Sequence, residues 1–268
     1  MTWTLLQGDS AEVLKTLDAD SIDLTVTSPP YDNLRTYKGF TFDFETIAQE
    51  LYRVTKPGGV VVWVVGDATV DGSETGTSFE QALYLKRIGF KLHDTMIYEK
   101  NGPSHPDNLR YQQVFEYMFV LSKGKPKTIN LIADRKNRWA GCSNFGTRTN
   151  RSQKGELEEG GTRLAGRTIK EYGIRWNVWE INTGFGYSAS DNTAYSHPAI
   201  FPEKLAHDHI VSWSNPGDTI FDPFAGSGTT LKMAEQLGRD SIGIEISGEY
   251  CEIIRRRMSN LQQTIFNL

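Results

Sequence analysis

The stretch Asp222-Pro223-Phe224-Ala225-Gly226-Ser227-Gly228-Thr229-Thr230 decides the fold. An apolar, β-branched run at residues 219–221 precedes it, and residues 229–237 continue it with helical spacing. Glycines in a turn between a strand and a helix let the backbone approach a ligand, and the start of the helix offers free N–H groups. The stretch therefore predicts a cofactor-binding loop within an α/β fold.

A second short motif, Thr27-Ser28-Pro29-Pro30-Tyr31, follows another apolar, β-branched run at residues 22–27. The two prolines end that expected strand and stiffen the loop after it. Ser-Pro-Pro-Tyr by itself would be read as a rigid turn. Its position after a buried strand, in a chain with a cofactor loop elsewhere, favours a catalytic loop.

Expected strands and helices alternate around these motifs. Strands are expected at residues 2–7, 22–27, 60–65, 93–99, 116–121, 219–221 and 241–246, and helices at residues 9–17, 44–54, 79–88, 202–213, 229–237 and 247–266. This alternation is typical of a doubly wound, mostly parallel sheet. Residues 125–195 are polar and weakly periodic, so we expect an insertion there, between a first half at residues 1–124 and a second half at residues 196–268.

Three kinds of cofactor use a glycine turn of this sort. A P-loop requires a Lys directly after its last glycine, and Thr229 stands there instead. A dinucleotide-binding turn requires a third small residue where Leu231 stands. Both fit poorly. The prefix Asp222-Pro223-Phe224 and the ending Gly-Ser-Gly-Thr-Thr instead resemble the S-adenosyl-L-methionine loop of a known methyltransferase family.

The two motifs together resemble the exocyclic-amino DNA methyltransferases, and their order, catalytic motif first and cofactor motif last, matches the beta class of that family. The resemblance covers most of the chain. It implies a circularly permuted, Rossmann-like methyltransferase sheet that binds S-adenosyl-L-methionine. The cofactor-binding residues that it implies in the glycine loop are Asp222, Pro223, Phe224, Gly226, Ser227, Gly228, Thr229 and Thr230.

Glu245 and Lys204 are two further cofactor candidates. Glu245 ends the next expected strand, 17 residues after Gly228, where a carboxylate can accept hydrogen bonds from both ribose hydroxyls; alternatively it is a surface Glu. Lys204 lies in residues 197–205, which resemble the family segment that closes over the methionine end of the cofactor. It could pair with the cofactor carboxylate, or it could be a solvated lysine at the start of a helix.

The motif order also predicts where the first strand lies. In the usual methyltransferase sheet, a third strand with an acid near the adenine follows the cofactor and ribose strands, but here the chain ends after the ribose strand and its helix. Residues 2–7 must then supply that strand, which makes Asp9 a candidate for contacting the adenine amino group. Asp9 and Glu12 also form the D-x-x-E pattern of a capping box, so both interpretations stay open.

Ser28, Pro29, Pro30 and Tyr31 are the implied catalytic residues. An exocyclic amine is a poor nucleophile because its lone pair is delocalised into the ring. Ser28 Oγ and the Pro29 carbonyl can accept hydrogen bonds from its two protons, and Tyr31 offers a face on which a flipped base can stack. The methyl group then passes directly, in line, to the nitrogen, and positioning supplies most of the catalysis.

Serine at the first position of the motif favours N4 of cytosine as the target. In the family, Ser-Pro-Pro-Tyr is associated mainly with N4-cytosine transfer and Asp-Pro-Pro-Tyr with N6-adenine transfer, so N6 of adenine is the alternative. C5-cytosine methylation is not expected because it requires a Cys nucleophile after a Pro. Cys142 follows Gly141 and Cys251 follows Tyr250.

The insertion concentrates basic charge. The whole chain has a formal net charge of −4, whereas residues 134–176 hold ten basic and five acidic residues, a local balance of +5. DNA phosphates attract such a surface, and in the beta class the target-recognition region lies between the two motifs. The candidates for DNA contacts are Arg135, Lys136, Arg138, Arg148, Arg151, Lys154, Arg163 and Arg167. Arg255, Arg256 and Arg257, near the C-terminus, are expected to form a solvated face.

Composition narrows the class of protein. No apolar stretch approaches the roughly 20 residues that span a bilayer, and the first residues do not read as a signal peptide. Two distant cysteines make a disulfide framework or a cysteine-based metal site unexpected, so a reducing cytoplasm is the expected location. The expected partner is double-stranded DNA, without membrane or metal. A homodimer and a cognate restriction endonuclease stay open.

The leading interpretation is a site-specific DNA methyltransferase that flips its target base. A methyltransferase for RNA or for a protein amide is one alternative, and a DNA-binding protein that has lost catalysis is another. The motif order and the basic insertion argue against the first, and the two intact motifs argue against the second. The recognition sequence and the base-reading residues do not follow from the sequence.

Overall fold

The computed structural model describes residues 2–30, 42–103, 108–143, 148–152, 154–160 and 167–266. Side chains at residues 148–151, 157–160 and 262–266 are not described. Two of the predicted site residues, Tyr31 and Arg163, lie outside the described residues.

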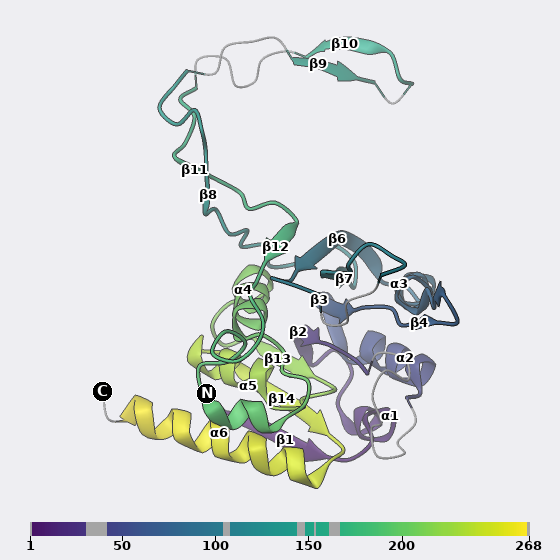
Figure 1. The fold of residues 1–268 in the computed structure, drawn as a ribbon, viewed down its shortest axis with the longest axis vertical. Helices are drawn as coiled ribbons and strands as arrows, with labels where there is room; N and C mark the ends of the chain where they lie inside the picture. Colours follow the sequence, from purple (N-terminus) through teal and green to yellow (C-terminus); the bar gives the residue numbers. More distant parts are fainter. Residues whose placement is uncertain are drawn as a thin grey trace. The chain divides into compact units, whose positions relative to one another are not determined.

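The core of the molecule is an eight-stranded sheet in the order β1-β14-β13-β2-β3-β7-β6-β12 (Figure 1). Its strands, in that order, are β1 (Trp3–Gln7), β14 (Asp240–Glu245), β13 (Thr219–Asp222), β2 (Ile22–Thr27), β3 (Thr55–Val65), β7 (Phe115–Ser122), β6 (Lys91–Glu99) and β12 (Val178–Glu180). β7 pairs antiparallel with β3 and with β6, and every other neighbouring pair in this sheet is parallel. The predicted mostly parallel sheet is confirmed.

Helices cover both faces of this sheet (Figure 1). The described helices are α1 (Ser10–Val13), α2 (Phe44–Val54), α3 (Thr77–Arg87), α4 (Glu203–Trp213), α5 (Thr229–Gln236) and α6 (Gly248–Phe266), with the 3-10 turns η1 (Leu14–Thr16) and η2 (Asn192–Ser196). Alternate residues of β3 point to opposite faces, as strand geometry requires. Val62 is buried in the core beneath α4 and α5, and its neighbour Trp63 in the core beneath α1, α2 and α3. The sheet is doubly wound, as the alternation of strands and helices predicted.

The first strand lies where the motif order placed it. β1 runs parallel beside β14, with Gln7 opposite Glu245, and the Gly8 N–H donates to the Glu245 carbonyl at 3.0 Å. The final helix α6 then packs its Ile254 and Met258 with Trp3 of β1. The circular permutation is confirmed, because the N-terminal strand completes the sheet that the C-terminal half begins.

Residues 131–176 form a separate compact unit, and residues 1–130 and 177–268 form the other. The smaller unit contains two antiparallel pairs, β8 (Arg135–Lys136) with β11 (Tyr172–Gly173) and β9 (Arg148–Arg151) with β10 (Leu157–Gly160). It spans fewer residues than the predicted insertion at residues 125–195. The reason is that the chain returns to the sheet at β12, where Trp179 and Ile181 are buried in the main core.

Two compositional features have simple structural counterparts. None of the helices in the described part of the chain is both long and apolar enough to cross a membrane. Both cysteines are free thiols, Cys142 exposed and Cys251 buried.

A short hairpin of β4 (Thr69–Val70) and β5 (Ser73–Glu74) follows the end of β3.

Candidate active site

A cleft of about 2550 Å³ opens along the edge of the sheet where the parallel strands end. Its lining includes the residues that directly follow β1, β2 and β3, the last residues of β13 and β14, and the first residues of the antiparallel β7. Ligands of doubly wound sheets bind at this edge, because the loops that follow the strands meet there. All the described residues that line the cleft belong to the larger unit.

Ser28, Pro29 and Pro30 line this cleft directly after β2. Pro29 is buried, and Ser28 and Pro30 are half-buried. Since β2 lies beside β13, the strand that leads into the glycine loop, the structure brings the two sequence motifs to one place. The fourth predicted catalytic residue, Tyr31, is outside the described residues.

One carboxylate ties the two loops together. Asp222, the last residue of β13, accepts a hydrogen bond from Thr27 Oγ1 at 2.7 Å and another from the Phe224 N–H at 3.0 Å, both on Oδ1. Burial raises the pKa of Asp222 to about 6, and the hydrogen bond from Thr27 and that from the Phe224 N–H oppose the rise. The Thr230 hydroxyl adds a second link by donating to the Val26 carbonyl at 3.1 Å.

Two glycines give the cofactor loop its shape. Gly226 and Gly228 have φ values of 53° and 80°, in the left-handed region that side chains disfavour. A Cβ on Gly226 would come within 3.3 Å of the His197 ring, and one on Gly228 within 3.0 Å of Ile254. The loop is thus pressed between residue 197 on one side and helix α6 on the other.

The predicted residues of the loop divide into two sets. Six of them line the cleft: Asp222, Pro223, Phe224, Gly226, Ser227 and Thr229. Gly228 and Thr230 are not part of the lining. Gly228 packs against α6 and Thr230 bonds to β2, so both hold the loop against its neighbours.

Glu245 lies at the end of β14 and lines the cleft, with 8% of its surface exposed. Its Oε2 accepts from the Gly226 N–H at 2.9 Å and its Oε1 from the Ser247 N–H at 2.8 Å. Burial raises the pKa of this carboxyl, and the hydrogen bonds from Ser247 and Gly226 partly oppose that. A carboxylate has about four lone-pair sites, so each oxygen keeps capacity for a further donor.

The structure bears on both interpretations of Asp9 that the sequence left open, a helix cap and a contact to adenine. It is the N-cap of α1, with Oδ1 accepting from the Ala11 N–H at 2.8 Å, and it also lines the cleft. Glu12 pairs with Lys15 at 2.8 Å. Within the described part of the chain, Asp9 Oδ2 accepts no hydrogen bond, so one oxygen caps the helix and the other is left for a potential donor in the cleft.

Lys204 is a cofactor candidate that does not lie with the other candidates in the cleft. It lies in the first turn of α4 with its side chain 56% exposed, and its Nζ lies 2.8 Å from Asp208 Oδ2. It is not part of the cleft lining. The preceding residues, 197–202, do line the cleft, and the ring of His197 contacts that of Tyr250 at 4.3 Å between centroids.

Several lining residues were not among the sequence candidates. Lys100 and Glu116 form an ion pair of 2.8 Å within the cleft, and Arg110, Tyr111 and Phe185 also line it. Tyr111 and Phe185 are highly exposed aromatic side chains. The sequence could have indicated Lys100 as a site residue, because it directly follows a predicted strand. Residues at such positions gather at the ligand-binding edge of the sheet.

The described basic candidates of the smaller unit are spread over its short strands and the segments beside them. Arg135 stacks over Trp176 at 4.9 Å from the ring centroid, and Arg138 over Trp139 at 5.4 Å. Lys136, Lys154 and Arg167 are exposed. Arg148 and Arg151 are the ends of β9, and their side chains are not described.

The expectation for the three consecutive arginines of α6 is wrong at one position. Arg255 and Arg256 are exposed, whereas Arg257 is 2% exposed. It points inward because α6 places every third or fourth residue against the body of the protein, where the carboxylates of Asp191 and Glu203 lie within reach.

Comparisons with known proteins give the site its context. The matching family model, N6_N4_Mtase, described as DNA methylase, covers residues 22–256. The chain is 60% identical over 240 residues to the orphan methyltransferase M.BamHII of Bacillus amyloliquefaciens, across 90% of this chain and 89% of that protein. It is 25% identical over 297 residues to the type II methyltransferase M.SmaI of Serratia marcescens, across 95% of this chain and 90% of that protein.

Solved structures agree in fold. TTHA0409 of Thermus thermophilus, in its complex with S-adenosyl-L-methionine, matches with a TM-score of 0.65 and 25% identity over 97% of this chain and 94% of that one. PvuII DNA methyltransferase, which is cytosine-N4-specific, matches with a TM-score of 0.69 and 20% identity over 96% of this chain and 86% of that one. With the family model spanning most of its length and a relative at 60% identity, this chain belongs to the N6 and N4 family of DNA methylases.

Proposed function

We propose that this protein transfers a methyl group from S-adenosyl-L-methionine to the exocyclic amine of a base flipped out of duplex DNA, with N4 of cytosine as the favoured target. The observation that carries the proposal is the single cleft that contains both Ser28-Pro29 and the glycine loop. The link from Thr27 to Asp222 holds the residue before Ser28 against the strand that leads into that loop.

The residues around the glycine loop fit an adenosyl cofactor. The left-handed glycines keep side chains out of the loop, so a ligand can approach its backbone. Glu245 is a buried carboxylate with room for two more donors, which suits the two hydroxyls of a ribose. Asp9 Oδ2 can accept from an adenine amino group. When bound, S-adenosyl-L-methionine supplies an electrophilic methyl group on its sulfonium.

Ser28 and Pro29 prepare the amine for that transfer. The Ser28 hydroxyl oxygen and the Pro29 carbonyl accept the two N–H groups of the amine, which draws its lone pair out of the ring and aims it at the methyl group. The fixed φ of proline sets the direction of the Pro29 carbonyl. Because the transfer is direct, no covalent enzyme intermediate is needed. These residues contribute to the rate by orienting the amine.

DNA is the substrate class that the rest of the molecule favours. The smaller unit carries the basic residues suited to phosphate contacts, while the larger unit supplies the cleft. A base must leave the duplex to reach Ser28, which is half-buried in that cleft. Tyr111 and Phe185 are exposed aromatic rings in the cleft lining and suit stacking on unpaired bases.

The preference for N4 of cytosine depends on Ser28, the first residue of the motif, and N6 of adenine is the second candidate. The relative at 60% identity is named an orphan methyltransferase. This supports action without a cognate restriction endonuclease. The proposed location is the cytoplasm, where the cofactor and DNA are both accessible.

Product analysis tests the proposal. The purified protein is incubated with mixed-sequence duplex DNA and S-adenosyl-L-methionine, the DNA is digested to nucleosides, and the products are identified by mass spectrometry. N4-methylcytosine is the expected product. N6-methyladenine would contradict the base preference and keep the reaction type, and no methylated nucleoside from any duplex would contradict a DNA substrate.

Ser28→Ala is the first variant to make. Because it removes one of the two acceptors for the amine, we expect kcat to fall by about 100-fold or more, the size of effect seen when one hydrogen-bonding group is removed from a catalytic site. Cofactor binding, measured by calorimetry, should not change. Ser21→Ala is the matched control, since Ser21 lies just before the same strand and donates to the Asp18 carbonyl at the surface. Equal activity of the two variants would exclude Ser28 from the chemistry.

A further inference from the structure

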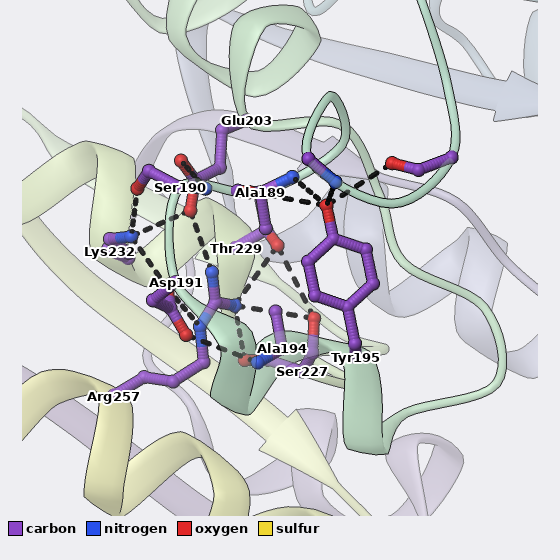
Figure 2. Close-up of polar contacts among 12 residues, drawn as sticks. Ala189, Ser190, Asp191, Ala194, Tyr195, Glu203, Ser227, Thr229, Lys232 and Arg257 are labelled. Carbon is purple, nitrogen blue, oxygen red and sulfur yellow. Dashed lines mark hydrogen bonds and ion pairs between the residues drawn. The ribbon is translucent and has the colours of Figure 1, made fainter.

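A cluster of four charged side chains lies behind the glycine loop (Figure 2). Arg257 of α6 and Lys232 of α5 supply two positive charges, and Asp191 and Glu203 supply two negative ones. The Arg257 side chain has no exposed surface, and that of Lys232 has 7%. Charges this deeply buried are tolerated only with close partners, so the geometry of the cluster is tightly specified.

Arg257 contacts the cofactor loop and its surroundings at the same time. Its Nη1 donates to the Ser227 carbonyl at 2.6 Å and lies 3.3 Å from Ser227 Oγ and 3.2 Å from Thr229 Oγ1. Its Nε donates to Asp191 Oδ2 at 3.0 Å, and its Nη2 to Glu203 Oε1 at 2.8 Å. A guanidinium spreads five N–H groups over three nitrogens, so it can reach all these separated acceptors together, whereas the single nitrogen of an ammonium group has only three N–H groups.

The Lys232 side chain binds the same two carboxylates. Its Nζ lies 2.8 Å from Asp191 Oδ2, 2.7 Å from Glu203 Oε1 and 2.9 Å from Ser190 Oγ, which accounts for its three N–H groups. Burial by itself would raise the pKa of Asp191, but the hydrogen bond from Lys232 and the charge of Arg257 lower it overall. Asp191 is therefore ionised at neutral pH.

The two carboxylates belong to a segment that forms one wall of the cleft. Asp191 is the N-cap of η2, and Glu203 begins α4. Between and before them, Phe185, Ser188, Tyr195 and residues 197–202 line the cleft. The Tyr195 hydroxyl accepts from the Gly186 N–H at 2.8 Å and from the Ala189 N–H at 3.2 Å, which folds this wall onto itself (Figure 2).

We propose that Arg257 is a positioning residue for the cofactor site: it fixes the Ser227–Thr229 part of the glycine loop and fastens the wall at residues 184–203 to that loop. Nothing in the sequence pattern assigns this role. The inference rests on the proposed function, since the loop is taken to bind the cofactor. Arg257 itself is not in the cleft lining, so it acts through the groups that it holds.

Arg257→Lys is the variant that tests this role. It keeps a positive charge between Asp191 and Glu203 but cannot also reach Ser227 and Thr229. We expect the Kd of S-adenosylhomocysteine, measured by calorimetry, to rise about tenfold, as for the loss of one charge-assisted hydrogen bond. In steady-state kinetics we expect a matching rise in the KM for S-adenosyl-L-methionine with little change in kcat.

Arg255→Lys is the matched control, because Arg255 lies on the exposed face of the same helix and pairs with Glu252. A purely structural role predicts a different pattern: a lower unfolding temperature for Arg257→Lys with an unchanged Kd at temperatures where the protein is folded. That pattern would overturn the inference. If Arg257→Lys does not fold, Glu203→Gln decides, since Glu203 lies outside the cleft lining; a raised Kd supports the role and an unchanged one overturns it.

The experiment also separates this inference from the proposed function. If neither the wild type nor Arg255→Lys binds S-adenosylhomocysteine, the cofactor assignment fails and the positioning role fails with it. If both bind and Arg257→Lys binds equally well, only the positioning role of Arg257 fails.

Discussion

At the scale of single residues, one carboxylate oxygen joins the two halves of the site. Asp222 Oδ1 accepts both the Thr27 hydroxyl and the Phe224 N–H, so the catalytic loop and the cofactor loop share an anchor. Asp222 is 5% exposed and its pKa is raised to about 6 by burial. The site therefore contains an acid whose ionisation is costly in the folded protein.

That cost predicts a pH dependence of stability. In the unfolded chain the pKa of Asp222 is near 3.8, so between about pH 4 and pH 6 the folded state binds the proton more tightly. The contribution of Asp222 to the free energy of unfolding is greatest below pH 4. It falls as pH rises through 6, by about 3 kcal/mol in all.

Asp222→Asn removes this dependence, because its amide oxygen can still accept both hydrogen bonds and cannot ionise. Urea unfolding of wild type and variant at pH 4, 5, 6 and 7 should show the wild type losing stability relative to the variant over this range. Asp18→Asn, at an exposed position, is the control. A constant difference between wild type and Asp222→Asn at all four pH values would show that folding does not raise the pKa of Asp222.

At the scale of elements, the turn between β13 and α5 depends on Gly228. Its φ of 80° opposes a side chain there, and so does Ile254, which lies 3.0 Å from the position that a Cβ would take. Gly72 has nearly the same φ, 79°, and open space around it. The two glycines therefore separate backbone strain from the steric clash.

Gly228→Ala should lower the free energy of unfolding by more than Gly72→Ala does. Backbone strain costs each variant roughly 1 kcal/mol, and the clash with Ile254 adds about 1 kcal/mol or more in Gly228→Ala alone. Urea unfolding measures both, and calorimetry should show weaker cofactor binding in Gly228→Ala only. Equal losses of stability would mean that α6 moves aside without cost.

Strand and helix predictions succeeded where local pattern is strong. β2 and α2 have the predicted limits, because residues 22–27 are rich in apolar and β-branched side chains and residues 44–54 have helical spacing before a Pro-Gly-Gly stop. β12 was missed. Its three residues are too few to show a period, and they form a strand only because the edge of β6 offers hydrogen-bonding partners.

At the scale of the whole molecule, the proposed function divides cofactor binding and DNA binding between the two units. All the described residues that line the cleft lie in the larger unit, and the basic surplus lies in the smaller one. Ile132 and Arg175 are joined by a backbone hydrogen bond of 2.9 Å, so a short linker can connect them. The smaller unit can therefore be removed cleanly.

Replacing residues 133–174 with a short Gly-Ser linker should leave S-adenosylhomocysteine binding unchanged and weaken duplex DNA binding by about tenfold or more. The slope of log Kd against log salt should also decrease, as fewer counterions are released. Calorimetry and electrophoretic mobility shifts measure the two affinities. The milder variant Lys154→Gln/Arg167→Gln should reduce the salt slope while keeping the unit intact. Undiminished DNA binding by the deletion variant would move the DNA surface to the larger unit.

The sequence by itself determined the fold class, the permutation and the two loops of the site. These depend on local features: the apolar period of the strands, the glycines of residues 226 and 228, and the order of the motifs along the chain. The place of β1 beside β14 followed because a sheet that lacks one strand at its C-terminal half must take it from elsewhere.

Only the tertiary structure decided which charged residues serve the site. Arg257 is buried among carboxylates from two distant segments, while Arg255, on the same helix, is exposed. Lys204 pairs with Asp208 outside the cleft, and Lys100 pairs with Glu116 inside it. A charged residue has the same local pattern in each case, and its role depends on which partners the packing of remote elements brings within hydrogen-bonding distance.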